Sequence, residues 1–194
     1  ANRALEIMGY EKGDYQHCYP NDHLNLSQST NDVYPTTVRL TIIMMNHLLV
    51  KHLAALNSSF RLKGKEFSDV IKMGRTQLQD AVPMTLGQEF EAFSATLDEE
   101  ITLLNNISNL FLEINMGGTA IGTGINAPQG YAKLCAEKLA NLTGESFISA
   151  PNLVEATPDT GSYVIYSSAL KRLAVKLSKI CNDLRLLSSG PRAG

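Results

Sequence analysis

A run rich in uncharged hydrogen-bonding side chains lies between Tyr19 and Asp32 and ends in Ser29, Thr30 and Asn31. It leads into a long helical pattern, and the start of a helix supplies free backbone N–H groups and a partial positive charge. Ser29, Thr30 and Asn31 placed there would bind a carboxylate. Helix capping by Asn31 or Asp32 is the structural alternative, but capping requires one such residue and the run contains several. The run therefore predicts a carboxylate-binding cradle.

A second polar loop, residues 74–83, precedes another long helical pattern and contains Thr76 and Gln77. By its residues alone it is as consistent with an ordinary surface loop as with a binding site. His23, in the first run, has no second His or carboxylate at metal-ligand spacing, so we interpret it as a structural, hydrogen-bonded histidine. The sequence therefore predicts no metal site.

A third loop, residues 117–124, is rich in glycine and threonine and superficially resembles a nucleotide-binding loop. A dinucleotide-binding fingerprint follows a strand and opens a βαβ unit, whereas this loop follows a helical pattern. We therefore reject nucleotide binding. The loop instead predicts a tight backbone turn that approaches a small ligand or a neighbouring chain closely.

The elements that position these loops are long helices. Apolar residues three or four positions apart predict amphipathic helices over 38–60, 86–114 and 164–187, and a shorter helix runs from Pro128 to Gly144. No hairpin signal or strand alternation competes with them. The predicted fold is all-α, an elongated bundle of long helices whose apolar stripes form the core and are extensive enough to favour self-association. The stripes include Met45, Leu53, Leu56 and Phe60 in the first helix and Leu170, Leu173 and Ile180 in the last.

Composition excludes several classes of partner. The net charge is -2, and the 17 basic and 19 acidic residues are scattered, which gives no footprint for nucleic acid or an anionic membrane. No apolar run approaches the roughly 20 residues of a membrane span, and no signal peptide is evident. The 3 cysteines lack metal-ligand spacing and indicate unpaired thiols, so we expect a cytoplasmic protein. The abrupt ends, at Ala1 and Gly194, predict a fragment of a longer chain.

Five segments carry a resemblance to a known family: residues 20–23, 28–32, 74–90, 118–124 and 188–194. In their order along the chain these segments resemble the aspartase/fumarase enzymes, and the match extends over essentially the whole sequence. Within that family, residues 74–90 are similar to one branch of aspartases, because fumarases usually carry His where Gln77 stands. Tyr19 occupies the position of a fumarase His that belongs to a secondary anion site, which puts that site in doubt here.

The resemblance implies a lyase that reversibly eliminates ammonia from L-aspartate to give fumarate through an aci-carboxylate intermediate, without a redox or pyridoxal cofactor. By analogy, Ser29, Thr30 and Asn31 would contact the substrate, and Thr76 and Gln77 would complete the cradle. Gln77 cannot protonate at neutral pH, so its implied role is hydrogen bonding only. A divalent-metal activator is left open.

The resemblance also implies what lies outside residues 1–194, which would be a central helical domain. The family's catalytic serine base would lie beyond Gly194, so neither Ser188 nor Ser189 is assigned as the base, and a carboxylate-binding Thr-Ser segment would precede Ala1. Family members are homotetramers whose active sites draw on three subunits, so the isolated chain is expected to be inactive. The alternatives are a fumarase or another succinyl-substrate lyase and, from a different class, a non-catalytic helical oligomerisation scaffold.

Overall fold

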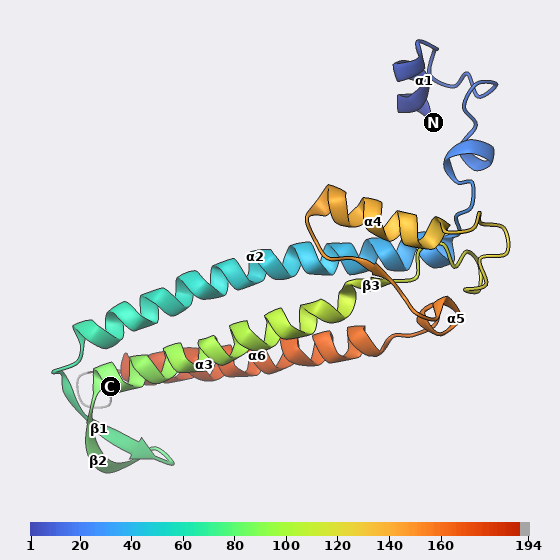
Figure 1. Ribbon diagram of the computed structural model, residues 1–194. Helices are drawn as coiled ribbons and strands as arrows, with labels where there is room; N and C mark the ends of the chain where they lie inside the picture. The colour runs from blue at the N-terminus through green and yellow to red at the C-terminus, as the bar shows by residue number, and fades with distance from the viewer. Residues whose placement is uncertain (191–194) are drawn as a thin grey trace. The chain divides into compact units, whose positions relative to one another are not determined.

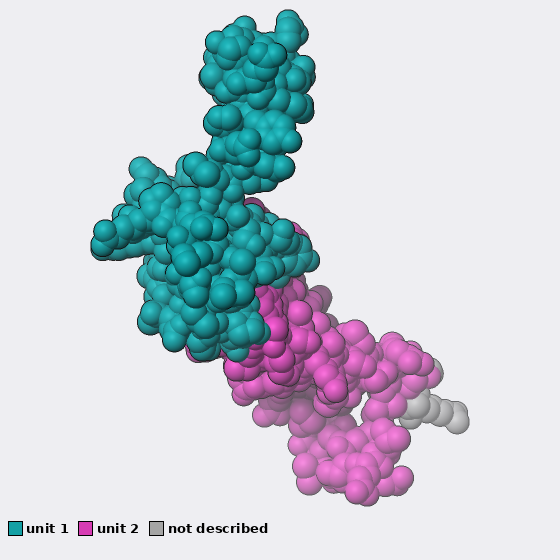
Figure 2. Space-filling model, turned by 90° about the vertical axis from the view of Figure 1, so that its right-hand side faces the viewer, with its two compact units in different colours: residues 1–41, 111–159 teal, residues 42–110, 160–194 magenta. Residues whose placement is uncertain are grey.

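The computed structural model describes residues 1–190, and helices dominate it (Figure 1). The chain forms two compact units (Figure 2). Unit 1 comprises residues 1–41 and 111–159, and unit 2 comprises residues 42–110 and the chain from 160 onward. The longest helix, α2 (Thr30–Glu66), begins in unit 1 and continues into unit 2.

Unit 2 is built on the second part of α2 together with α3 (Leu86–Ser108) and α6 (Gly161–Leu187). Phe60 of α2 packs against Phe93 of α3, with ring centroids 5.6 Å apart, and α3 packs along α6. Thr85 caps α3 through a capping box with Gln88. The apolar core of this unit is formed by Ile43, Leu53, Phe60, Phe93, Leu97, Leu104, Leu173 and Ile180.

Polar residues are also buried between the helices of unit 2. The hydroxyl of Tyr166 on α6 donates to Asn46 Oδ1 on α2 at 3.0 Å. Glu100 on α3 is fully buried, and its Oε1 lies 3.0 Å from Arg172 Nη2 and 2.5 Å from Lys176 Nζ, both on α6. Because an unpaired buried charge is costly, these two ion pairs fix how α6 lies along α3.

A β-hairpin joins α2 to α3. Its strands β1 (Ile71–Thr76) and β2 (Gln79–Thr85) pair antiparallel, with Thr76 opposite Gln79. The two turn residues, Gln77 and Leu78, both have left-handed backbones, with φ of 49° and 63°. The expectation that no hairpin competes with the helices is therefore wrong. Left-handed positions in two-residue turns usually carry Asn-Gly, and Gln-Leu gives no such signal in the sequence.

Unit 1 holds the start of α2 and several short elements around it. Phe111 and Ile114 are its fully buried apolar side chains near the short strand pair, in which β3 runs parallel to β4. The elements are α1 (Asn2–Met8), a π-helical turn η1 (Pro20–Leu24), β3 (Glu113–Ile114), α4 (Tyr131–Thr143), β4 (Ile148–Ser149) and α5 (Leu153–Ala156); a 3-10 turn η2 (Asn109–Phe111) follows α3.

The predominantly helical class predicted from the sequence is confirmed, with corrections in detail. The second long helix ends at Ser108 rather than 114, and the shorter helix begins at Tyr131 but closes at Gly144, whose φ is 78°. Gly144 therefore acts as the predicted C-cap. Not every stripe residue is buried within this chain: Met45 is 57% exposed, and Leu56 and Leu170 are also exposed.

Helix α2 is long and apolar enough, by length and composition alone, to cross a membrane. The expectation that no segment approaches a membrane span therefore does not hold for this helix. The finding carries little weight, because a core helix of a soluble protein passes the same test. In α2, the buried Asn46 and Asn57 face polar partners on α6 and α3.

Candidate functional site

The first turn of α2 is capped by a reciprocal pair of side chains. Ser29 Oγ accepts the N–H of Asn31 at 3.2 Å, and Asp32 Oδ1 accepts the N–H of Ser29 at 2.8 Å. Asp32 therefore takes part in capping, as the structural alternative held. Ser29 is the capping residue, and Thr30 and Asn31 remain exposed at the helix start.

The other carboxylate oxygen of Asp32 binds the glycine-rich loop. Asp32 Oδ2 accepts the N–H of Gly117 at 3.1 Å and that of Thr119 at 2.9 Å, and the side chain is 0% exposed. Gly117 has φ of 90°, and a Cβ there would lie 2.7 Å from Ala132, so the close approach requires glycine. The tight turn predicted at 117–124 is confirmed, and the group that it approaches is a carboxylate of the same chain.

Asn31 is held by the same loop. Its Nδ2 donates to the backbone carbonyl of Ala120 at 2.7 Å. The backbone carbonyl of Asn31 accepts a hydrogen bond from Asn115 Nδ2 at 2.9 Å. With Nδ2 directed at a carbonyl, Asn31 Oδ1 is the acceptor that this side chain can offer to a ligand. An acceptor suits an ammonium group, while the hydroxyls of Ser29 and Thr30 can donate to a carboxylate.

Ser29 and Thr30 border a hollow of about 600 Å³ in unit 1, whereas Asn31 does not line it. Its lining is largely polar and carries no charged side chain, and it consists of Asn21, Asn25, Gln28, Ser29, Thr30, Val33, Tyr34 and Thr37. His23, nearby in sequence, accepts the N–H of Tyr19 on Nδ1 at 2.9 Å. The hydrogen bond expected of His23 is therefore present.

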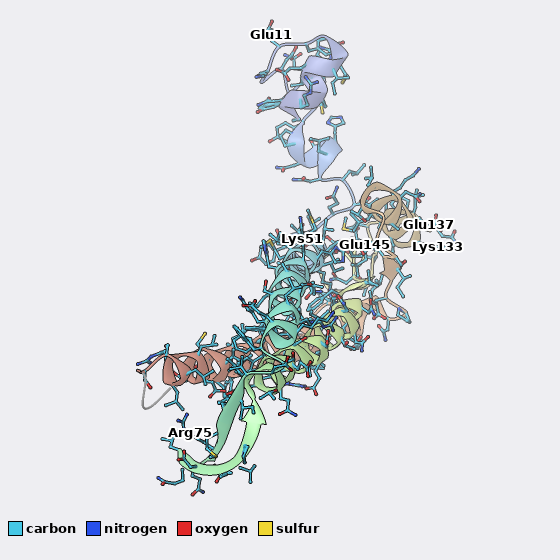
Figure 3. All side chains as sticks on the ribbon, turned by 90° about the vertical axis from the view of Figure 1, so that its left-hand side faces the viewer. Glu11, Lys51, Arg75, Lys133, Glu137 and Glu145 are labelled. Atoms are coloured by element: carbon cyan, nitrogen blue, oxygen red, sulfur yellow. The ribbon has the colours of Figure 1, made fainter. Side chains whose placement is uncertain are left out.

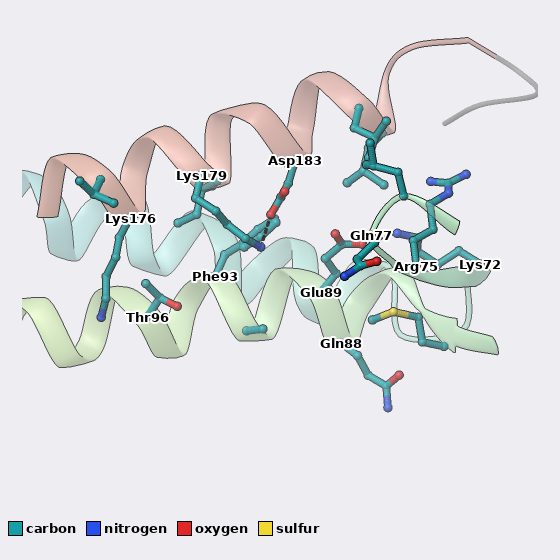
Figure 4. A pocket seen from close by; sticks show the side chains of 17 residues that line it. Lys72, Arg75, Gln77, Gln88, Glu89, Phe93, Thr96, Lys176, Lys179 and Asp183 are labelled. Atoms are coloured by element: carbon teal, nitrogen blue, oxygen red, sulfur yellow. Dashed lines mark hydrogen bonds and ion pairs between the residues drawn. The ribbon is translucent and has the colours of Figure 1, made fainter. Parts of the chain in front are cut away.

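Thr76 and Gln77, the other predicted site residues, lie at the hairpin turn in unit 2. Gln77 lines a cavity of about 670 Å³ between the hairpin, α3 and α6, whereas Thr76 is exposed and does not line it. In Figure 4, Gln77 lies at the same end of this cavity as Arg75, and Lys176 lies toward the other end. The five predicted residues therefore form two groups, one in each unit.

Charged residues that sequence reasoning missed line the Gln77 cavity. Its wall carries four cationic side chains and two carboxylates: Lys72, Arg75, Lys176, Lys179, Glu89 and Asp183. Lys72 pairs with Glu89, and Lys179 pairs with Asp183. Arg75 extends from the hairpin (Figure 3), and its Nε lies 3.7 Å from Asp80 Oδ1. Lys176 also pairs with Glu100, so each of the four cations has a carboxylate partner.

Two pKa shifts in these regions have clear causes. The contact with Glu100 raises the pKa of Lys176, aided by Glu99 and opposed by burial, so the ammonium stays charged in the cavity wall. In unit 1, burial raises the pKa of Tyr131 to about 12, with further contributions from Cys135 and from the charge of Asp32. Tyr131 therefore remains a neutral phenol beside the buried carboxylate.

Comparison with known proteins identifies the family. The family model described as Lyase matches residues 1–194. The chain belongs to this lyase family. Aspartate ammonia-lyases are among its similar relatives: that of Helicobacter pylori is 58% identical over the whole chain, and that of Escherichia coli K12 is 57% identical. This lyase chain spans 42% and 41% of the lengths of those two proteins.

Solved structures give the same result. The lyase chain superposes over its full length on fumarate lyase:delta crystallin from Brucella melitensis bound to cobalt, with a TM-score of 0.97 and 57% identity, and covers 42% of that protein. It also matches a class II fumarase from Schistosoma mansoni, with a TM-score of 0.88 and 32% identity, and covers 44% of it. Among residues 1–190 of the lyase chain, no three His, Cys, Asp or Glu side chains gather to hold a metal ion.

Proposed function

We propose that this chain is the substrate-cradling part of an aspartate ammonia-lyase, which eliminates ammonia from L-aspartate to give fumarate, reversibly. The observation that carries the proposal is the neutral, polar hollow at the start of α2, which Ser29 and Thr30 line, with Asn31 beside them in the same turn. Its support from relatives is the 56–58% identity to proteins of that name.

The chemical difficulty is the removal of a weakly acidic proton next to a carboxylate, which places two negative charges on one carboxyl group in an aci-carboxylate intermediate. Donors fixed in advance around that group bind it more strongly than they bind the substrate carboxylate, and this difference lowers the barrier. In the proposal, the Ser29 and Thr30 hydroxyls are such donors. Asn31 Oδ1 accepts a hydrogen from the substrate ammonium.

Gln77 and Thr76 complete the cradle in the proposal by hydrogen bonding alone. The proposal places them with Ser29, Thr30 and Asn31 in a homotetramer whose active sites are shared between subunits. The exposed apolar residues Met44 and Met45 on α2 and Val164 and Val175 on α6 are surface that such an assembly would cover. The serine base is proposed to lie outside this chain, and the enzyme to be cytoplasmic.

The test is turnover by the full-length parent enzyme, with fumarate followed by its ultraviolet absorbance. We expect release of fumarate from L-aspartate and none from malate or argininosuccinate. Turnover of malate but not aspartate would replace the assignment by a fumarase, and no turnover of any of the three would favour the scaffold alternative. The isolated chain, which spans 41–42% of its relatives' lengths, is expected to be inactive.

Within the parent, Thr30→Ala removes one proposed donor at an exposed position. We expect its catalytic efficiency with L-aspartate to fall by about 100- to 1000-fold, the range for loss of one donor to a developing oxyanion. Ser58→Ala, which removes an exposed hydroxyl that donates to the Ala54 carbonyl within α2, is the matched control. Equal efficiencies for the two variants would remove Thr30 from the cradle.

A further inference from the structure

We propose that Asp32 is a positioning residue of the cradle: its buried carboxylate joins the first turn of α2 to the glycine-rich loop and thereby sets the orientation of Asn31. This inference rests on the proposed function. Asp32 is 0% exposed, so it does not touch the substrate. Its effect on turnover would pass entirely through the residues that it holds.

The first step is the number of donors on this carboxylate. Asp32 accepts three backbone N–H groups, from Ser29 on one oxygen and from Gly117 and Thr119 on the other. A helix cap requires only the first of these, and an aspartate that only capped could keep its second oxygen in water. Here the second oxygen is buried in the loop. The two loop bonds therefore serve something other than capping.

The second step is what the loop contacts. Ala120 follows directly after Thr119, and its carbonyl accepts Asn31 Nδ2 at 2.7 Å. Asp32 thus binds the loop at Thr119, and the next residue, Ala120, orients the side chain of Asn31. The same two segments are also joined by Asn115 Nδ2, which donates to the Asn31 carbonyl, and by Ser27 Oγ, which donates to the Asn126 carbonyl at 3.4 Å.

The third step is the cost of the loop conformation. Thr119 has φ of 57°, a left-handed backbone that a threonine adopts only when its surroundings hold it. That conformation directs its N–H to Asp32 Oδ2. With the negative charge removed, the loop loses the group on which its amides converge, and we expect residues 117–120 to relax away from α2. Asn31 would then lose its fixed orientation.

The test is Asp32→Asn in the full-length parent enzyme. The substitution preserves shape, but the new amide must turn its NH₂ group toward either Ser29 N–H or the two loop N–H groups, so donor faces donor in both orientations. We expect kcat for L-aspartate to fall by about 10- to 100-fold, the scale of a misplacement near 1 Å, with a smaller rise in KM and with native helicity by circular dichroism. Hydrogen exchange of amides 117–120 should accelerate.

The matched control is Ser94→Ala, because Ser94 is a buried polar residue of unit 2 that bonds Asn57 and Arg61 and lies outside the proposed cradle. We expect Ser94→Ala to lower Tm about as much as Asp32→Asn does, but to keep its kcat within twofold of the wild-type value. A kcat loss in Ser94→Ala as large as that in Asp32→Asn would show that activity follows stability, and would overturn a positioning role. Unchanged kcat and unchanged exchange at 117–120 in a folded Asp32→Asn enzyme would also overturn it.

The two proposals fail in distinguishable ways. If the wild-type parent does not turn over L-aspartate, the proposed function fails, and the cradle role of Asp32 fails with it. In that case, accelerated hydrogen exchange at 117–120 in Asp32→Asn would show only that Asp32 holds the glycine-rich loop in place. If the wild-type parent is active and Asp32→Asn retains full kcat, the positioning role alone is wrong.

Discussion

The left-handed turn of the β1–β2 hairpin gives a prediction whose size follows from backbone geometry. Leu78 has φ of 63° and is 73% exposed. A left-handed backbone costs a non-glycine residue about 1–2 kcal/mol, and glycine avoids this cost. Glycine in turn loses about 0.5–1 kcal/mol more than other residues in conformational entropy on folding. We therefore expect Leu78→Gly to raise the free energy of unfolding by about 0.5–1 kcal/mol.

The matched control is Leu78→Ala, which removes the same exposed side chain but keeps the left-handed cost. The measurement is urea unfolding of both variants by circular dichroism. For a slope of about 2 kcal/mol per molar urea, the glycine variant should unfold at a midpoint about 0.3–0.5 M higher than the alanine variant. A glycine variant that is no more stable than the alanine variant would refute the reasoning, because it would show that the turn imposes no backbone cost.

Three further predictions concern the core, an ion pair and a pH response. Leu104→Ala, at a fully buried position of α3, should lower the free energy of unfolding by about 2–5 kcal/mol in urea, whereas Leu142→Ala, at a position 84% exposed, should change it little; a loss below about 1 kcal/mol at Leu104 would contradict the assigned core. Lys176→Met leaves the buried Glu100 with Arg172 alone and should lower the free energy of unfolding by about 1–2 kcal/mol. This loss is smaller than that for a fully broken buried pair, because one cation remains and the Lys176 ammonium is partly solvated. A variant as stable as the wild type would show that this ion pair contributes nothing. Because the pKa of Tyr131 is raised to about 12 in the folded chain, its contribution to stability is complete below its ordinary pKa of 10.0 and is lost as pH rises toward about 12; the pH dependence of Tm in Tyr131→Phe should lack this loss, and identical curves for variant and wild type would contradict the shift.

The helical framework was readable from the sequence because spacing alone predicts a buried face. Leu53, Phe60, Leu173 and Ile180 were assigned to the core from three- and four-residue intervals, and all are buried. Met45 has the same spacing and is exposed. Periodicity identifies an apolar face, but it cannot tell whether the covering surface belongs to the same chain.

The site was less predictable, because its contacts join distant segments. Asp32 was recognisable as a helix-capping residue, but its bonds to Gly117 and Thr119 span 85 and 87 positions of the sequence. The charged wall around Gln77 likewise combines Lys72 of the hairpin with Lys176 of α6. Residue types indicated that residues 19–32 could bind a ligand and that residues 117–124 could approach one closely. Only the fold shows that one segment binds the other.

The bond between Asp32 and the glycine-rich loop has a consequence for protein engineering. The amides of Gly117 and Thr119 form a small anion receptor, and the chain fills it with its own side chain. Residue 32 and the loop must therefore be changed together. A loop transplanted into another helical scaffold would need an acidic residue brought with it, and a chain with glycine at position 32 would leave a vacancy of the size and polarity that chloride or formate could occupy.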